Sequence, residues 1–151
     1  MTIDLLSAPA QTVAVTRGTQ RLLFDMGYDC LGEFTFRSGR RADLIGMDRT
    51  GRIVIVEVKV SVPDFRGDSK WREYLEWCDA FYFAVPGEFP RDLLPDDHGL
   101  IVADAWGGEV LRPPFMGAIH ASRRKALTLQ FGRVAARRLA GLGDPSNRMD
   151  W

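Results

Sequence analysis

The sequence predicts a single α/β domain over residues 11–142, in which helices flank a mixed central sheet. Three observations support this fold class. Residues 40–60 hold two apolar runs around a short polar break that contains Gly51, the pattern of a β-hairpin. Apolar residues recur at helical spacing near both ends of the chain. A further apolar run, from Phe81 to Val85, follows a helical segment, so we expect the chain to return to the sheet in a parallel position.

The N-terminal part is predicted to contain one helix and one strand. The helix spans about 11–26, where Gly27 follows as a stop and apolar residues recur near helical spacing: Val15, Leu22, Leu23 and Met26. Residues 1–10 precede it and are expected to form a flexible arm. The strand spans 28–37 and is followed by a turn at Ser38-Gly39.

The segment between the hairpin and the next strand is predicted to be helical. Ser61 is placed to cap a helix start, and Pro63 suits the first turn of a helix. After an interruption near Gly67, a helix is expected from Asp68 or Ser69 to Cys78. Its apolar residues form one stripe, which predicts that they face the core: Trp71, Tyr74, Leu75 and Cys78.

The C-terminal part is predicted to add a β-hairpin and a long helix. The strands are expected at 99–105 and 109–112, joined through Trp106-Gly107-Gly108. The helix is expected over 118–142, with a buried stripe of Leu127, Phe131, Val134 and Leu142. Residues 143–151 are expected to form a flexible tail.

Composition limits the functional classes. The chain has 151 residues, of which 46% are hydrophobic and 26% are charged, values typical of a globular domain. No apolar run reaches the roughly 18 residues of a membrane span, and we expect no signal peptide. Cys30 and Cys78 stand far apart, which argues against a zinc site or a disulfide framework. We therefore expect a cytoplasmic protein without membrane partners.

Charge is unevenly distributed along the chain, although the net charge is zero. Residues 1–111 contain 12 Lys and Arg against 18 Asp and Glu, a formal charge of −6. Residues 112–151 contain 8 against 2, a formal charge of +6. Two interpretations stay open: a basic face for a polyanion, or a solvated Arg-rich helix.

The second run of the hairpin contains an anomaly. Its first residues predict a central strand covered on both faces, yet Glu57 and Lys59 follow in the same run. Charged side chains are rarely buried unless they are paired or bind a metal. Strand alternation places Glu57 and Lys59 on one face. The hairpin register that pairs Met47 with Ile53 then places Asp43 directly opposite Glu57.

This arrangement of charges suggests a chemistry. Two carboxylates opposite each other repel, and a divalent cation between them removes the repulsion. Together with Lys59, the pair Asp43 and Glu57 provides the components for phosphodiester hydrolysis: metal ligands, an activated water and a cation for developing charge. The cofactor expected is Mg²⁺, or Mn²⁺. The structural alternative is that Glu57 pairs with Lys59 or Arg41 at a strand end, in a fold that serves protein–protein contact.

The same residues carry a family resemblance. Asp43, followed after thirteen residues by Glu57-Val58-Lys59, resembles the signature of the PD-(D/E)XK (restriction-endonuclease-like) nuclease superfamily, with Ala42 where a Pro is usual. Four longer segments together resemble the MmcB-type DNA-repair proteins of alphaproteobacteria: Gly39–Asp43, Val56–Lys59, Asp64–Trp71 and Phe81–Pro86. The resemblance implies an αβββαβ core, to which the C-terminal hairpin and helix are added.

The resemblance also implies roles for further residues. The backbone carbonyl of Val58 is a candidate third metal ligand, and Lys59 would position the attacking water or stabilise the pentavalent phosphorus. Lys70 and Tyr74 stand where some of these nucleases have a Gln-x-x-x-Tyr motif facing the site; the alternative is an exposed Lys beside a core Tyr. Glu33 is either a further carboxylate beside the pair or an exposed strand glutamate. The candidate catalytic residues are Asp43, Glu57, Lys59, Glu33 and Lys70.

The resulting expectation is a DNA-repair protein that acts as a Mg²⁺-dependent DNA endonuclease. The alternative is a catalytically silent DNA-binding or docking subunit of a repair complex. DNA would be held by side chains from three parts of the chain: Arg41, Lys70, Tyr74, Arg133 and Arg137. Other repair proteins are candidate partners, formation of a homodimer is left open, and nucleoid association is expected when DNA is bound.

Overall fold

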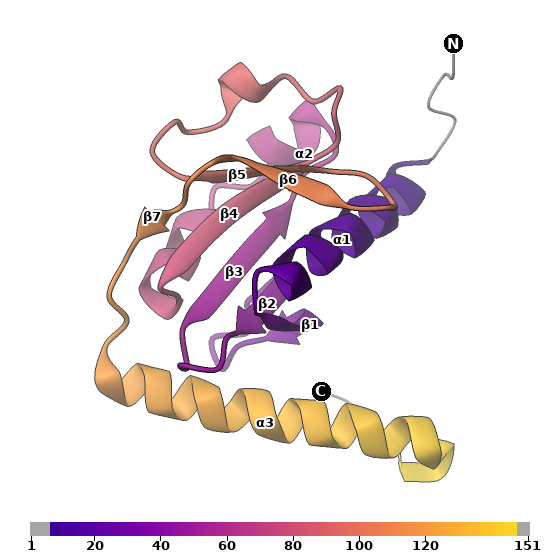
Figure 1. The fold of residues 1–151 in the computed structure, drawn as a ribbon, viewed down its shortest axis with the longest axis vertical. Helices are drawn as coiled ribbons and strands as arrows, with labels where there is room; N and C mark the ends of the chain where they lie inside the picture. Colours follow the sequence, from indigo (N-terminus) through magenta and orange to yellow (C-terminus); the bar gives the residue numbers. More distant parts are fainter. Residues whose placement is uncertain (1–6, 148–151) are drawn as a thin grey trace.

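The computed structural model describes residues 7–147 and contains one mixed seven-stranded sheet between helices (Figure 1). Six strands follow one another across the sheet in chain order: β1 (Asp29–Thr35), β2 (Arg41–Met47), β3 (Ile53–Val58), β4 (Ala80–Val85), β5 (Gly99–Ala103) and β6 (Gly108–Arg112). The short β7 (Phe115–Met116) pairs with β4. The pairs β3–β4 and β4–β5 are parallel and the others are antiparallel, so the predicted mixed α/β fold is confirmed.

The β2–β3 hairpin has the predicted register, with Met47 opposite Ile53. Its turn is closed by Asp48, whose carboxylate accepts hydrogen bonds from the backbone N–H groups of Thr50 and Arg52, both at 2.9 Å. Gly51 has a φ of 87°, a conformation that favours glycine because it has no Cβ. A turn of this kind leaves little freedom for slippage, so the positions along both strands follow from it.

Helix α1 (Ala8–Asp25) covers one face of the sheet (Figure 1). Val15 and Leu23 are buried in the apolar cluster that it forms with β2, β3 and β4. The helix begins three residues earlier than predicted, because Ser7 caps it by accepting a hydrogen bond from the N–H of Ala10. Residues 8–10 therefore do not form the expected arm, and residues 1–6 lie outside the described part. Met26, predicted as the last residue of the helix, is its C-cap and is exposed.

The crossover between β3 and β4 is only partly the predicted helix. Ser61 caps α2 (Val62–Arg66) as expected, but this helix ends after five residues. The following segment is a 3₁₀-helix, η1 (Trp71–Trp77), and not an α-helix over 69–78. Aromatic residues stand there at intervals of three, which eclipse on one face of a 3₁₀-helix: Trp71, Tyr74 and Trp77. Packing of these rings under the sheet favours the tighter helix.

Helix α3 (Ala121–Gly143) runs along the end of the sheet that carries the β2–β3 turn and extends past it (Figure 1). Leu127 is fully buried, and Phe131 and Val134 are partly buried against the core. Leu142, predicted in the same stripe, is 83% exposed, because α3 has run past the sheet at that point. The predicted tail begins with a 3₁₀ turn, η3 (Pro145–Asn147), and residues 148–151 lie outside the described part.

Two smaller features complete the described chain. A 3₁₀ turn, η2 (Arg91–Leu93), stands in the connection between β4 and β5. Among residues 7–147, no helix is long and apolar enough to cross a membrane.

Candidate active site

Asp43 and Glu57 face each other where the β2–β3 ladder ends. The last ladder pair is Leu44 with Val56, and the same register carries one step further to Asp43 and Glu57. Here the side chains replace the backbone ladder. The N–H of Val58 donates to Asp43 Oδ2 at 2.8 Å, and the N–H of Asp43 donates to Glu57 Oε1 at 3.3 Å. The two carboxyl groups are thus anchored to backbone and directed at each other.

Burial makes this pair hard to ionise. Burial raises the pKa of Glu57 to about 8, and the neighbouring charge of Asp43 adds to the effect. The pKa of Asp43 is also raised by burial, against the lowering effects of the Val58 hydrogen bond and the charge of Lys59. At neutral pH the pair therefore retains a proton that a divalent cation could replace.

Lys59 lies beside the pair and is almost fully buried, with 6% of its surface exposed. Its Nζ is 2.8 Å from Asp68 Oδ2 and 3.9 Å from Asp64 Oδ1. Burial by itself would lower the pKa of Lys59, but Asp68, Asp64 and Glu57 together raise it. Lys59 is therefore a charged ammonium that carries its proton firmly.

Asp64 and Asp68 were not predicted as site residues. They come from α2 and the turn after it, which cover the end of β3. Burial opposes ionisation of Asp68, but its hydrogen bond with Lys59 lowers the pKa of the carboxyl below its usual value. Asp64 and Asp68 are four residues apart just after the Ser61 cap, and this spacing is the signal in the sequence that places both on one side of a helix.

The donor set suits a hard cation with few protein ligands. Among the described residues, no group of three or more Asp, Glu, His or Cys side chains could hold a metal ion. Mg²⁺ is commonly held by one or two carboxylates, with the remaining positions taken by water and substrate. Asp43 and Glu57 match that smaller requirement. The N–H and C=O of one strand residue point to the same edge, so the Val58 carbonyl also faces β2.

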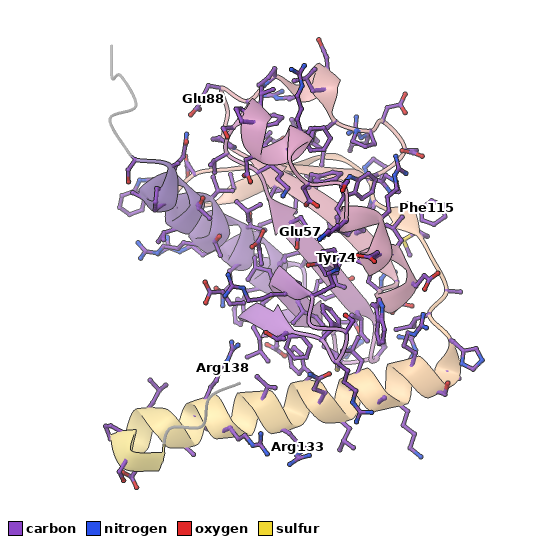
Figure 2. All side chains as sticks on the ribbon, turned by 180° about the vertical axis from the view of Figure 1, so that it is seen from behind. Glu57, Tyr74, Glu88, Phe115, Arg133 and Arg138 are labelled. Carbon is purple, nitrogen blue, oxygen red and sulfur yellow. The ribbon has the colours of Figure 1, made fainter. Side chains whose placement is uncertain are left out.

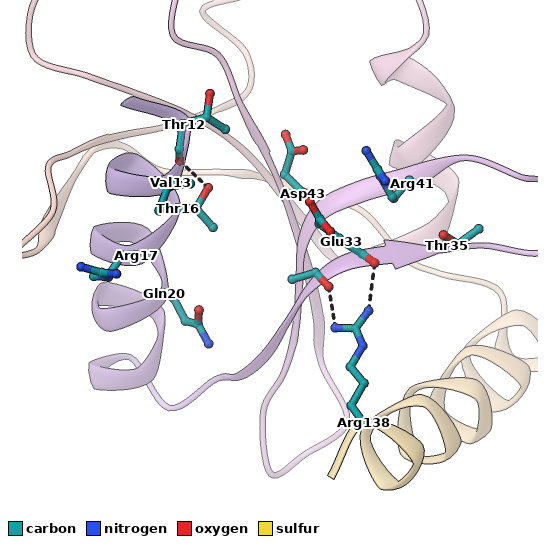
Figure 3. Close-up of a pocket in the computed structure, with 11 residues that line it drawn as sticks. Thr12, Val13, Thr16, Arg17, Gln20, Glu33, Thr35, Arg41, Asp43 and Arg138 are labelled. Carbon is teal, nitrogen blue, oxygen red and sulfur yellow. Dashed lines mark hydrogen bonds between the residues drawn. The ribbon is translucent and has the colours of Figure 1, made fainter. Parts of the chain in front are cut away.

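A pocket of about 680 Å³ opens beside Asp43, between α1 and the edge formed by β1 and β2 (Figure 3). It is lined by Thr12, Val13, Thr16, Arg17 and Gln20 of α1, Gly32, Glu33 and Thr35 of β1, Arg41 and Asp43 of β2, and Arg138 of α3. Glu57 and Lys59 do not line it. Asp43 and Glu57 lie opposite each other, but of the three residues expected in one cleft only Asp43 reaches it.

Glu33 stands opposite Asp43 in the β1–β2 register and has a φ of 48°, a left-handed conformation that is strained for a residue with a Cβ. The guanidinium of Arg138 holds this backbone in place. It donates to the carbonyls of Gly32 at 2.6 Å and Glu33 at 2.9 Å, as the dashed lines in Figure 3 show. Glu33 is exposed and lines the pocket with Asp43. Arg138 was missed at the sequence level because no local pattern joins residues so far apart.

Of the residues predicted to act beside Asp43, Arg41 lies at the surface and Tyr74 lies in the core. Arg41 is exposed and lines the pocket, whereas Arg40 turns the other way and pairs with Glu73 at 2.6 Å. Tyr74 is buried, and its hydroxyl donates to the carbonyl of Arg41 at 2.7 Å. Tyr74 thus supports the strand from below Asp43, and its burial removes it from the surface that DNA could reach, which corrects its prediction as a DNA contact.

Lys70 does not join the site in the way its spacing from Tyr74 predicted. It is the N-cap of η1, it is exposed, and its backbone N–H donates to Asp68 Oδ1 at 2.9 Å. Four residues cover more than one turn of a 3₁₀-helix, so Lys70 and Tyr74 do not share a face. Lys70 contacts the site through its backbone, and its side chain remains available to solvent.

The arginines of the C-terminal segment do not form one solvated face. Arg112 donates to two carbonyls, Arg123 stacks on Trp77, and Arg124 binds Asp79. Arg133 is exposed on the side of α3 turned away from the sheet, whereas Arg138 points toward it (Figure 2). A second pocket of about 370 Å³, lined by residues of α3 and of the end of β1, has several arginines in its lining: Arg37, Arg133, Arg137 and Arg138.

The fold and the site define a mixed α/β protein with a buried Glu57, a partly buried Asp43 opposite it and a buried Lys59 at one end of the sheet. The chain belongs to the MmcB-like family of DNA repair proteins, whose model matches residues 5–146. It is also similar to the SPO1766 protein of unknown function from Silicibacter pomeroyi, with a TM-score of 0.88 and 38% identity over 99% of each chain. No curated protein matches the chain. Family membership indicates a role in DNA repair.

Proposed function

We propose that this protein is a Mg²⁺-dependent or Mn²⁺-dependent DNA endonuclease of the PD-(D/E)XK type that acts in DNA repair. The observation that carries the proposal is the pair of buried Glu57 and partly buried Asp43, which face each other with no cation paired to either carboxylate among the described ion pairs. Such a pair is costly to bury. A divalent cation bound between the two carboxylates would offset that cost, which a metal-binding function explains.

Each residue has a distinct task in this proposal. Asp43 and Glu57 would hold the cation, with the Val58 carbonyl as a third ligand. The cation would neutralise the carboxylates, lower the pKa of a bound water and polarise the phosphate. Lys59 keeps its proton because acidic residues surround it, so it would stabilise negative charge developing on phosphorus. Arg41 lines the pocket with Asp43 and would contact the scissile phosphate. Glu33 would add a carboxylate at the pocket wall.

A specific observation favours a second candidate, a catalytically silent DNA-binding or docking subunit of a repair complex. Glu57 and Lys59 are nearly covered, and Lys59 is bound by Asp68 and Asp64. To assist catalysis, the Lys59 ammonium must either leave these two carboxylates or act while still bound to them. The plain ion-pair alternative is less well supported, because the acidic partners of Lys59 in the described ion pairs are Asp64 and Asp68 and not Glu57.

A metal-dependent cleavage panel tests the proposal. Wild type and Glu57→Gln would be incubated with Mg²⁺ or Mn²⁺ and with single strands, nicks, flaps, mismatches and lesion-containing duplexes. An endonuclease cuts at least one substrate, and Glu57→Gln removes the cleavage. Calorimetry with Mn²⁺ alone adds a second readout, because binding to the protonated pair releases a proton. DNA binding that is indifferent to metal, with no cleavage of any substrate, would favour the silent subunit.

A further inference from the structure

Two large aromatic side chains stand in solvent on the side of the molecule formed by α1 and the β5–β6 turn. Trp106 is 80% exposed and Phe24 is 69% exposed. Both line a shallow pocket of about 560 Å³ together with Arg17, Gln20, Arg21 and Asp25 of α1. Within the described part of the chain, neither ring stacks on another ring or on a guanidinium. Exposed apolar surface of this kind commonly marks an interaction site.

The backbone under Trp106 is held in place. Asp104 Oδ1 accepts hydrogen bonds from the N–H groups of Trp106 at 2.8 Å and Gly107 at 3.1 Å. Arg21 donates to the carbonyl of Trp106 at 3.2 Å. Gly18 lets α1 approach this turn closely, because a Cβ at that position would lie 1.8 Å from the carbonyl oxygen of Asp104. The indole is therefore displayed on a rigid base, which lowers the entropy lost when a ligand orders it.

The surface continues to the candidate active site. Val13, Arg17, Gln20 and Phe24 recur at helical spacing on one side of α1. Arg17 and Gln20 line both this shallow pocket and the larger one that contains Asp43. Arg17 forms no hydrogen bond or ion pair among the described residues, so its charge is available to a ligand. Arg41 and Arg138 line the far end of the same path.

We propose that Trp106 and Phe24 form a stacking platform for the bases of single-stranded DNA, whose backbone follows Arg17 into the pocket at Asp43. Stacking on an aromatic side chain requires an unpaired base, because the faces of bases within a duplex are covered by their neighbours. The arginines beside the rings complement the phosphates, and exposed aromatics without a specific hydrogen-bonding frame suit any base. This deepens the proposed function by naming single-stranded or locally unpaired DNA as its substrate class.

The test measures binding without cleavage. The full chain, in EDTA, would be titrated with fluorescein-labelled oligothymidylate and with a duplex of equal length, and anisotropy would be followed. Trp106→Ala should weaken oligothymidylate binding about tenfold or more, whereas Trp106→Phe should stay within about threefold of wild type. Duplex binding should change little. Leu142→Ala is the matched control, because it removes an equally exposed apolar side chain at the end of α3.

Each outcome decides between occupants. Equal binding of oligothymidylate by wild type and Trp106→Ala overturns the platform. A change of oligomeric state in Trp106→Ala without DNA, seen by sedimentation, also overturns it and assigns the surface to a second copy of the chain. If Trp106 proves necessary for single-strand binding while no metal supports cleavage, the platform stands and the nuclease proposal fails. If cleavage depends on Glu57 but not on Trp106, the nuclease proposal stands and the platform proposal fails.

Discussion

Strand β3 has a carboxylate bound to its backbone at both ends, and the two ends differ in what neutralises that carboxylate. At the start, the N–H of Ile53 donates to Asp79 Oδ2 at 2.8 Å; at the end, the N–H of Val58 donates to Asp43 Oδ2, also at 2.8 Å. Asp79 is paired with the guanidinium of Arg124. Asp43 faces a second carboxyl group, that of Glu57.

The pKa shifts of the two carboxyl groups have opposite signs for this reason. Burial opposes ionisation of Asp79, but Arg124 and the Ile53 hydrogen bond lower its pKa below the usual value. At Asp43 the burial effect prevails, and its pKa is raised. The first arrangement is complete within the chain, and α3 is held by it. The second lacks a cation, and a proton or a metal ion must supply the charge.

The largest expected effect concerns catalysis. Asp43→Asn or Glu57→Gln should reduce metal-dependent cleavage by about a thousandfold or more, because each change removes a charged ligand that the reaction needs. Arg124→Ala, at the other end of β3, should leave the cleavage rate per folded molecule nearly unchanged. Rates would be measured at saturating metal, with circular dichroism to count the folded protein. Equal losses in both classes of variant would mean that stability, and not chemistry, explains them.

The next effect concerns stability and should fall on the opposite end of the strand. Arg124→Ala leaves Asp79 without its cation, and because Arg124 is partly exposed we expect a loss of about 2 kcal/mol in the free energy of unfolding. Urea denaturation measures it. Asp79→Asn in the same background should recover part of the loss, because the unpaired charge is then removed. In the absence of Mg²⁺, Glu57→Gln should hold or raise stability, since it removes repulsion.

The pH dependence of stability separates the two ends further. The folded-state pKa of Glu57 is about 8 against 4.5 for the free group, so the native state holds an extra proton between these values. Stability from this group is present at low pH and is lost as pH rises toward 8. Wild type should lose about 2 kcal/mol relative to Glu57→Gln between about pH 6 and about pH 8.5. Comparison at each pH cancels the contribution of His98, whose pKa is lowered by burial. Parallel curves for the two proteins would contradict a proton held by Glu57 in the native state.

The smallest effect concerns Arg133 and Arg137 of α3, which line the pocket of about 370 Å³ beside this helix. Arg133→Ala combined with Arg137→Ala should weaken DNA binding equally for all sequences and flatten the salt dependence by about two units, because phosphate contacts carry no base information. Arg133→Gln with Arg137→Gln is the matched variant, since it keeps side-chain length without charge. If the double alanine variant binds DNA as tightly as wild type at every salt concentration, DNA does not contact these arginines. Its path would then run over the surface at Arg41, Arg17 and Lys70.

Sequence alone determined the part of the site that depends on strand alternation. The hairpin turn around Gly51 and the apolar runs beside it set the register, and the register places Asp43 opposite Glu57. The fold class, the parallel return of β4 and the cap at Ser61 also follow from local patterns. Alternation and helical periodicity act over a few residues, so a single chain displays them directly.

Tertiary structure decided which partners each charge received. Asp68 binds Lys59, Arg124 binds Asp79, and Arg138 holds the strained backbone at Glu33. It also decided that Leu142 stays exposed and that Tyr74 supports a strand from within the core. Most of these contacts join segments distant in sequence, and each depends on the packing of whole elements against the sheet. Residue spacing does not reveal that packing. An arginine that binds a carboxylate therefore cannot be distinguished, in the sequence, from one that binds a carbonyl or faces solvent.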